Sequence, residues 1–147
     1  MPVRIFFSYS HEDEQLRNEL EKHLRILQRQ GKIISWSNRE TGVGQDWAKE
    51  INSNIRIADI ILLLISPGFM DSDYCYSIEM TQALERHKRS EAYIIPIILR
   101  AVDWKEAPFS NLHCLPSNGK PITSWHNLDE AFFEVAEGIR KVRHGSK

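Results

Sequence analysis

A chain of 147 residues with 41% hydrophobic and 27% charged residues has the composition of one globular domain with a single core. Its 19 basic residues are balanced by 20 acidic ones, which argues against a general attraction to nucleic acid. The longest apolar run is far shorter than the ~20 residues that span a bilayer, and the two cysteines form no disulfide framework or metal-ligand spacing. We therefore expect a cytoplasmic protein without a signal peptide, membrane contact or bound metal.

The amino-terminal half of the chain alternates between strand and helix patterns. Residues 3–9 (VRIFFSY) predict a first strand, and Ser10, followed by acidic residues, predicts the start of a helix. Leucines at helical spacing continue that helix to Gly31, after which residues 33–36 predict a second strand. The polar, glycine-containing segment 37–46 predicts a loop that leads into a second helix.

The most informative segment is an uninterrupted apolar strand followed by a helix that carries a glutamate. Residues 60–65 are all Ile or Leu and are followed by the turn sequence Ser-Pro-Gly, as expected for a strand buried on both faces of a parallel sheet. Ligands of such sheets bind beyond the carboxyl ends of the strands, which is where Glu79 is expected. At about 100° per residue, however, Glu79 shares a polar ridge with Gln82 and Arg86. A solvated surface glutamate is therefore the alternative.

The carboxyl-terminal part adds two more strand patterns and a final helix. Residues 93–99 predict a strand in which Pro96 indicates an edge position or an irregularity. Residues 101–119 predict a loop packed down by aromatic side chains, and residues 121–123 predict a short fifth strand. Asn127, with an acid three residues later, predicts the capped start of the last helix.

This order of elements predicts an α/β fold: a flavodoxin-like, doubly wound, five-stranded parallel sheet with helices on both faces. We expect a single domain over residues 1–143 and a frayed end at residues 144–147.

Four segments, in this order, resemble a Toll/interleukin-1 receptor (TIR) domain of bacterial type, and the resemblance covers nearly the whole chain. They are IFFSYSHEDE, WSNRETGVGQDW, LLLISPGFMDSDYCYSIEM, and a tail containing IIPIILRAVDW, APFSNL, LP and ITSW. Two positions depart from the family pattern. Cys75, with Tyr74 beside it, stands where enzymatic members often carry a tryptophan, and the loop after Arg39 lacks the usual Ile-x-Pro-Gly pattern.

The resemblance implies cleavage of NAD⁺ at the nicotinamide–ribose bond, with NAD⁺ as substrate and no further cofactor. Nicotinamide leaves the cationic pyridinium as a neutral molecule, so no general acid is needed and one carboxylate can stabilise the positive ribose. The implied catalytic residue is Glu79. The implied substrate-binding residues are Tyr9, Ser10, Arg39, Trp47, Tyr74 and Cys75.

Three functions remain open from the sequence. The first is an NAD⁺ hydrolase or cyclase that acts as the effector of a bacterial antiphage defence or signalling system, activated by association with other TIR domains and by a separate sensor. The second is a non-enzymatic TIR–TIR interaction module, which Cys75 favours and Glu79 does not. The third is a nucleotide-binding flavodoxin-like sensor without turnover.

Overall fold

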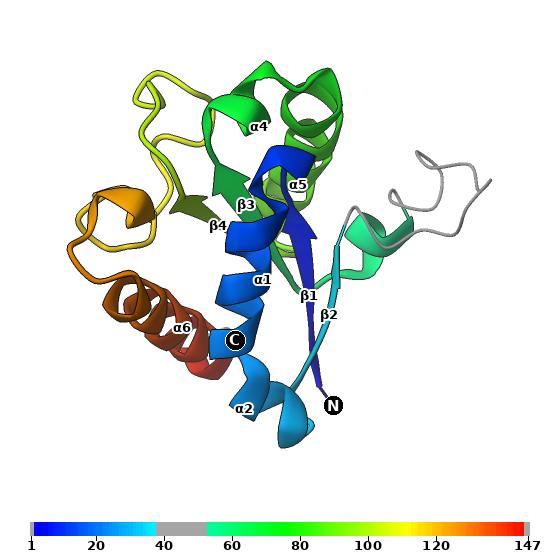
Figure 1. The fold of residues 1–147 in the computed structure, drawn as a ribbon. Coiled ribbons are helices and arrows are strands. Elements are labelled where there is room, and N and C mark those ends of the chain that lie inside the picture. The colour runs from blue at the N-terminus through cyan, green and yellow to red at the C-terminus, as the bar shows by residue number, and fades with distance from the viewer. Residues whose placement is uncertain (1, 38–52, 146–147) are drawn as a thin grey trace.

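In the part of the chain that the structure describes, the centre is a parallel sheet of four strands in the order β2-β1-β3-β4 (Figure 1). The computed structural model describes residues 2–37 and 53–145, with side chains described up to Val142. All three strand pairings are parallel, which confirms the predicted doubly wound, flavodoxin-like α/β fold. The strands are β1 (Val3–Ser8), β2 (Ile33–Ser37), β3 (Ile60–Ile65) and β4 (Tyr93–Ile98).

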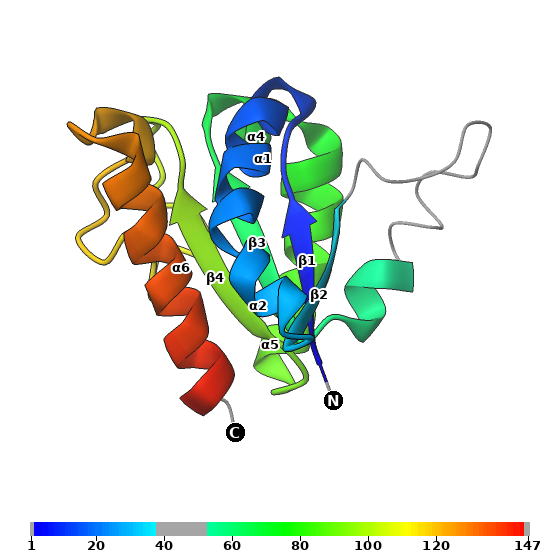
Figure 2. The same cartoon turned by 60° about the horizontal axis from the view of Figure 1, so that its bottom comes forward.

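Helices cover both faces of the sheet (Figure 2). One face packs against α1 (Glu14–His23), α2 (Arg25–Arg29) and α6 (Leu128–Gly145), and the other against α5 (Met80–Lys88) and a helical turn at residues 53–57. Within the described residues, no helix has the length and hydropathy that crossing a bilayer requires. The shorter elements are η1 (His11–Asp13), α4 (Pro67–Asp71), the π-helix η2 (Asp73–Glu79) and η3 (Ile122–Ser124).

Strand β3 lies at the centre of the core, as its sequence predicts. All six of its residues are buried. Because successive strand residues point to opposite faces, Leu62 and Leu64 pack in the cluster beneath α1 and α6. Leu63 and Ile65 pack in the cluster beneath α5. A strand that fills two cores has no polar face, which explains the uninterrupted Ile/Leu run.

Two predicted helix caps are confirmed. The Oγ of Ser10 accepts a hydrogen bond from the backbone N–H of Glu12 at 3.3 Å, and the Oδ1 of Asn127 accepts one from the backbone N–H of Glu130 at 3.1 Å. Helix α6 continues to Gly145, two residues past the boundary expected at residue 143.

The predicted fifth strand at residues 121–123 is wrong, because that segment forms the 3₁₀ turn η3. A single residue, Leu115, instead pairs beside β4: its N–H donates to Pro96 O at 2.9 Å and its C=O accepts from Ile98 N at 2.8 Å. The N–H of Ser117, two residues later, donates to the Glu134 carboxylate at 3.1 Å.

The positions of Pro96 and of the loop 101–119 agree with the sequence. Pro96 lies on the edge strand with its carbonyl directed outward to Leu115, so its missing N–H also lies on the outer side. The loop at residues 101–119 forms no regular strand or helix, and Phe109 within it is fully buried.

Candidate active site

The carboxyl ends of β1 and β3 meet at one edge of the sheet, and the segment after β3 brings a carboxylate to that edge. β3 ends at Ile65, and Ser66 caps α4 by accepting a hydrogen bond from Phe69 N at 3.1 Å. Ser72 then caps η2 in the same way, with Cys75 N as the donor at 3.1 Å. Glu79 is the last residue of η2 and is fully buried.

Glu79 lies where the π-helix η2 ends and the α-helix α5 begins. The N–H of Met80 donates to the carbonyl of Cys75, five residues earlier, instead of the residue four earlier as in an α-helix. The regular α-helix α5 follows Glu79 directly, so Glu79 keeps α-helical spacing with Gln82 and Arg86, but this ridge faces the fold: Glu79 is fully buried, and Arg86 binds backbone carbonyls of a neighbouring segment. The alternative of a solvated surface glutamate is therefore wrong.

Ser8 holds the buried carboxylate. Its Oγ donates a hydrogen bond to Oε1 of Glu79, and both side chains have no solvent exposure. An ionised carboxylate in a protein interior requires such donors, because burial removes the water that would otherwise solvate it. The Ser8–Glu79 pair thus places a polar, charge-bearing group at the edge where doubly wound sheets bind their ligands.

Tyr74 lies beside this pair and is half-buried. Burial raises the pKa of its hydroxyl, and the negative charge of Glu79 raises that pKa further. The phenol is therefore neutral at physiological pH and keeps its proton to donate. Cys75, four residues before Glu79, is buried within the cluster beneath α5.

Tyr9 lies on the opposite face of the sheet from the Ser8 side chain. It packs in the cluster beneath α1, where the guanidinium of Arg17 lies 5.4 Å from its ring centroid. Burial raises the pKa of Tyr9, while Arg17 and a hydrogen bond to Ser37 partly offset that shift. The structure therefore does not bring Tyr9 together with Glu79, and its role in substrate binding stays a prediction.

The remaining predicted binding residues differ in what the structure says of them. Ser10 is buried at the start of η1, against Gly68 of α4. Arg39 and Trp47 lie outside the described residues. The substrate contacts expected of Ser10, Arg39 and Trp47 stay predictions.

Ser8 is the site residue that the sequence analysis missed. The signal was present: Ser8 and Ser10 share a face of an extended chain, so the choice of Ser10 already pointed to Ser8. Ser8 is also the last residue of β1, and polar side chains at the carboxyl ends of parallel strands are candidates for ligand binding.

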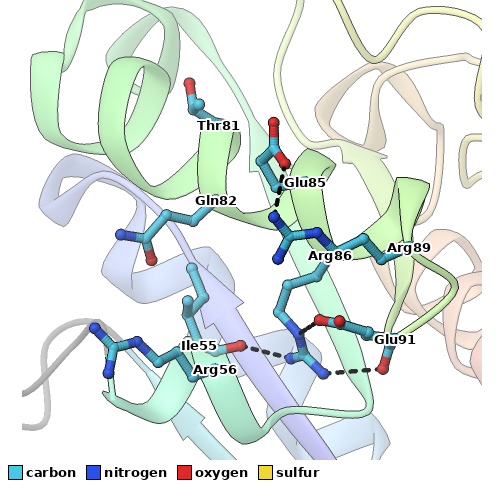
Figure 3. Close-up of a pocket in the computed structure, with 8 residues that line it drawn as sticks. All are labelled: Ile55, Arg56, Thr81, Gln82, Glu85, Arg86, Arg89 and Glu91. Atoms are coloured by element: carbon cyan, nitrogen blue, oxygen red, sulfur yellow. Dashed lines mark hydrogen bonds and ion pairs between the residues drawn. The ribbon is translucent and has the colours of Figure 1, made fainter.

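A cavity of about 510 Å³ lies beside α5, the helix that follows Glu79, and Glu79 is not among its lining residues (Figure 3). It opens between the helical turn at residues 53–57 and α5, with Ile55, Gln82 and Arg86 among its lining residues. The guanidinium of Arg86 is bound to the carbonyls of Ile55 at 2.7 Å and Ala58 at 2.6 Å. Its charge therefore serves to join two elements of the fold.

The fold and the site together define an α/β domain with its polar site at the carboxyl edge of a parallel sheet. The chain matches the TIR domain family over residues 5–131 and belongs to that family. It is also 55% identical over 138 residues to the uncharacterized protein y4lF of Sinorhizobium fredii (strain NBRC 101917 / NGR234). That alignment covers 94% of this chain and 43% of the relative, so the chain spans less than half of the relative's length.

Proposed function

We propose that this TIR domain cleaves NAD⁺ at the bond between nicotinamide and ribose, with Glu79 as the catalytic carboxylate. The observation that carries the proposal is the burial of Glu79 at the carboxyl edge of the sheet, where the hydroxyl of Ser8 donates to it. A glutamate that serves only as a polar group on a helix surface is exposed to water and is not enclosed in this way.

The chemistry requires one negative charge close to the reacting carbon. The C1′–N bond breaks with both electrons going to the pyridinium nitrogen, so nicotinamide leaves as a neutral molecule. Positive charge develops on C1′ and the ring oxygen, and the Glu79 carboxylate stabilises it. Water then adds to C1′ and loses a proton to give ADP-ribose; attack by a group of the ADP-ribosyl moiety itself gives a cyclic product.

The predicted binding residues take supporting roles in this proposal. Tyr74, whose proton is retained, donates to a ribose hydroxyl beside Glu79, and Cys75 lies in the position of the usual tryptophan. Ser10 lines the β1–α1 turn, and Arg39 and Trp47 complete the substrate contacts. NAD⁺ is the substrate, and association with other TIR domains completes the site.

The proposed biological role is that of an effector in a bacterial defence or signalling system of the cytoplasm. The relative is more than twice as long as the matched segment, which is compatible with a catalytic TIR domain joined to a sensor.

A non-enzymatic TIR–TIR interaction module is the second candidate, and two observations favour it. Glu79 is completely enclosed, and Cys75 offers no aromatic surface for stacking a nicotinamide ring. In this alternative the Ser8–Glu79 pair stabilises the fold alone.

The deciding experiment measures nicotinamide release from NAD⁺ at high protein concentration in crowded buffer. Wild type is compared with Glu79→Ala, with the isosteric Glu79→Gln, and with Glu85→Gln on the exposed part of α5 as the matched control. Turnover in wild type and in Glu85→Gln that vanishes in both Glu79 variants supports the enzyme. No turnover in any protein, at concentrations where self-association is visible, supports the interaction module. Equal turnover in all four excludes Glu79 as the catalyst.

A further inference from the structure

A second buried carboxylate, Asp13, lies at the same edge of the sheet as Glu79. Asp13 is 1% exposed and ends the 3₁₀ turn η1 that follows β1. Its Oδ2 accepts a hydrogen bond from the Oγ of Ser66, and its Oδ1 accepts one from the Nε of Arg100 at 2.8 Å. Each buried carboxylate thus receives a hydrogen bond from a serine at the end of a strand: Ser8 is the last residue of β1, and Ser66 follows β3.

Asp13 joins the ends of three strands. It belongs to the turn that follows β1, Ser66 follows β3 directly, and Arg100 lies two residues after β4. One carboxylate therefore fixes the relative positions of three loops at the carboxyl edge.

This cluster carries more negative than positive charge, which argues that it is structural. Arg100 contacts Asp13 at 2.8 Å and Glu12 at 3.5 Å, so its one positive charge faces two negative ones. A cluster with this balance does not attract an anionic ligand such as a pyrophosphate.

Between the two carboxylates, the β1–α1 turn and α4 are in direct contact. A Cβ built on Gly68 would lie 2.8 Å from the Oγ of Ser10 and 3.0 Å from Oε1 of Glu12. Real Cβ atoms do not approach other atoms so closely, so only glycine allows the two segments to pack at this distance.

These contacts form one continuous interface, which we call the turn interface. It consists of the pairs Asp13–Ser66, Ser10–Gly68 and Ser8–Glu79, and it joins residues 8–13 to residues 66–79 at both ends and in the middle. The chain between Ser66 and Glu79 is α4 and η2, two short helices that lie close to each other. This segment gives a continuous path of contacts from the Asp13 end of the turn interface to Glu79.

We propose that Asp13 is a positioning residue for Glu79: by binding Ser66 and Arg100 it sets the turn interface so that Ser8 and Glu79 meet. The catalytic part of this inference rests on the proposed function, whereas the structural part does not. Asp13 touches no substrate in this arrangement.

The experiment compares Asp13→Asn with Asp59→Asn as the matched control. Asp59 also binds an arginine and also joins β1 to β3, through Arg4 N at 2.8 Å and Arg4 Nε at 3.4 Å, but at the opposite end of both strands. Arg100→Lys, which keeps the positive charge and loses the Nε donor, is a second, milder variant. Each protein is studied at a temperature where thermal unfolding shows it to be folded.

Two quantities are measured: hydrogen exchange of the backbone amides in η2, and the kcat and KM of nicotinamide release. We expect Asp13→Asn to accelerate exchange in η2 about tenfold. We expect it to lower kcat roughly ten- to a hundredfold, because misplacement by about 1 Å can have that effect, with KM within about twofold. Asp59→Asn changes neither quantity, and Arg100→Lys changes both in the same direction by less.

The outcomes separate this inference from the proposed function. Unchanged exchange in η2 of a folded Asp13→Asn overturns the inference whatever the turnover. Accelerated exchange confined to Asp13→Asn and Arg100→Lys supports the positioning of Glu79, even if wild type releases no nicotinamide, in which case the proposed function alone fails. Accelerated exchange with unchanged kcat in an active enzyme overturns the catalytic part.

Discussion

Ser8 and Glu79 are 71 positions apart in the chain, yet the hydroxyl of one donates a hydrogen bond to the carboxylate of the other with no solvent between them. Ser8 is delivered by the end of β1 and Glu79 by the end of η2. Because both side chains are enclosed, a change to either one is felt in stability as well as in any reaction at this edge.

Ser8→Ala tests the pair from the serine side. We expect a loss of about 1–3 kcal/mol in the free energy of unfolding, because a buried carboxylate loses its donor. The measurement is urea unfolding, with Ser35→Ala as control, since the hydroxyl of Ser35 donates to the partly exposed Glu21 at 2.9 Å. A Ser8→Ala protein no less stable than Ser35→Ala would contradict the role assigned to Ser8.

Gly68→Ala tests the close packing of the turn interface. The added methyl group overlaps Ser10 and Glu12, so we expect a loss of about 1–3 kcal/mol in stability. Ser10→Gly removes the Oγ and Cβ that the added methyl group would meet. By itself it lowers the free energy of unfolding by only roughly a few tenths of a kcal/mol, because glycine is tolerated at a helix cap. The double variant should regain most of the stability in thermal unfolding. A double variant as unstable as Gly68→Ala would show that the strain lies elsewhere.

Arg86→Lys tests the contact between α5 and the helical turn at residues 53–57 (Figure 3). The lysine ammonium lacks the planar set of N–H donors of a guanidinium and cannot bind the carbonyls of Ile55 and Ala58 together. We therefore expect a loss of about 2–3 kcal/mol in the free energy of unfolding. Arg89→Lys is the matched control: its pair with Glu85 is exposed and 3.6 Å long, and its loss should stay within about 0.5 kcal/mol. Equal unfolding midpoints for the two variants would refute this assignment.

Tyr74 predicts how stability depends on alkaline pH. Burial and the charge of Glu79 raise the pKa of Tyr74 above the value of about 10 that tyrosine has in the unfolded chain. A group with a raised pKa stabilises the fold below the unfolded value, and this contribution is lost as the pH rises. Tyr74→Phe should therefore lose less stability than wild type between about pH 8 and pH 11.

Urea unfolding at several pH values measures this difference, and Tyr93→Phe, which removes the hydroxyl of an exposed tyrosine, is the control. Glu79→Gln should act in the same direction as Tyr74→Phe, because it removes the second cause of the raised pKa. If the free energy of unfolding falls equally with rising alkaline pH in wild type and in Tyr74→Phe, burial of Tyr74 is not coupled to its ionisation.

The elements that the sequence predicts correctly are those with a local signal. β3 is recognisable because burial on both faces demands an unbroken apolar run, and the caps at Ser10 and Asn127 are recognisable because a side-chain oxygen must satisfy the first helical N–H groups. Pro96 indicates the edge strand because it lacks an N–H.

The elements that the sequence does not predict correctly depend on partners distant in the chain. The strand predicted at residues 121–123 is instead the 3₁₀ turn η3, in which Thr123 N donates to the carbonyl of Leu99 far earlier in the chain, and no local pattern reveals that partner. The burial of Glu79 is not predicted because its ridge with Arg86 is polar, and only the assembled fold shows that this ridge faces inward, where Arg86 binds carbonyls distant in the chain. The pairing of Asp13 with Arg100, 87 residues away, requires the assembled sheet.

The wider turn of η2 has a consequence for how function is inherited among chains of this fold. Removing a single residue between Ser72 and Glu79 would restore ordinary α-helical spacing and change the rotation of the glutamate relative to the Ser72 cap by about 100°. Two proteins can therefore share the sheet, the helices and a glutamate in the same region of the alignment, and still differ in whether that glutamate reaches the sheet edge. For relatives of this domain, the number of residues between the cap of η2 and the glutamate is more informative than overall similarity.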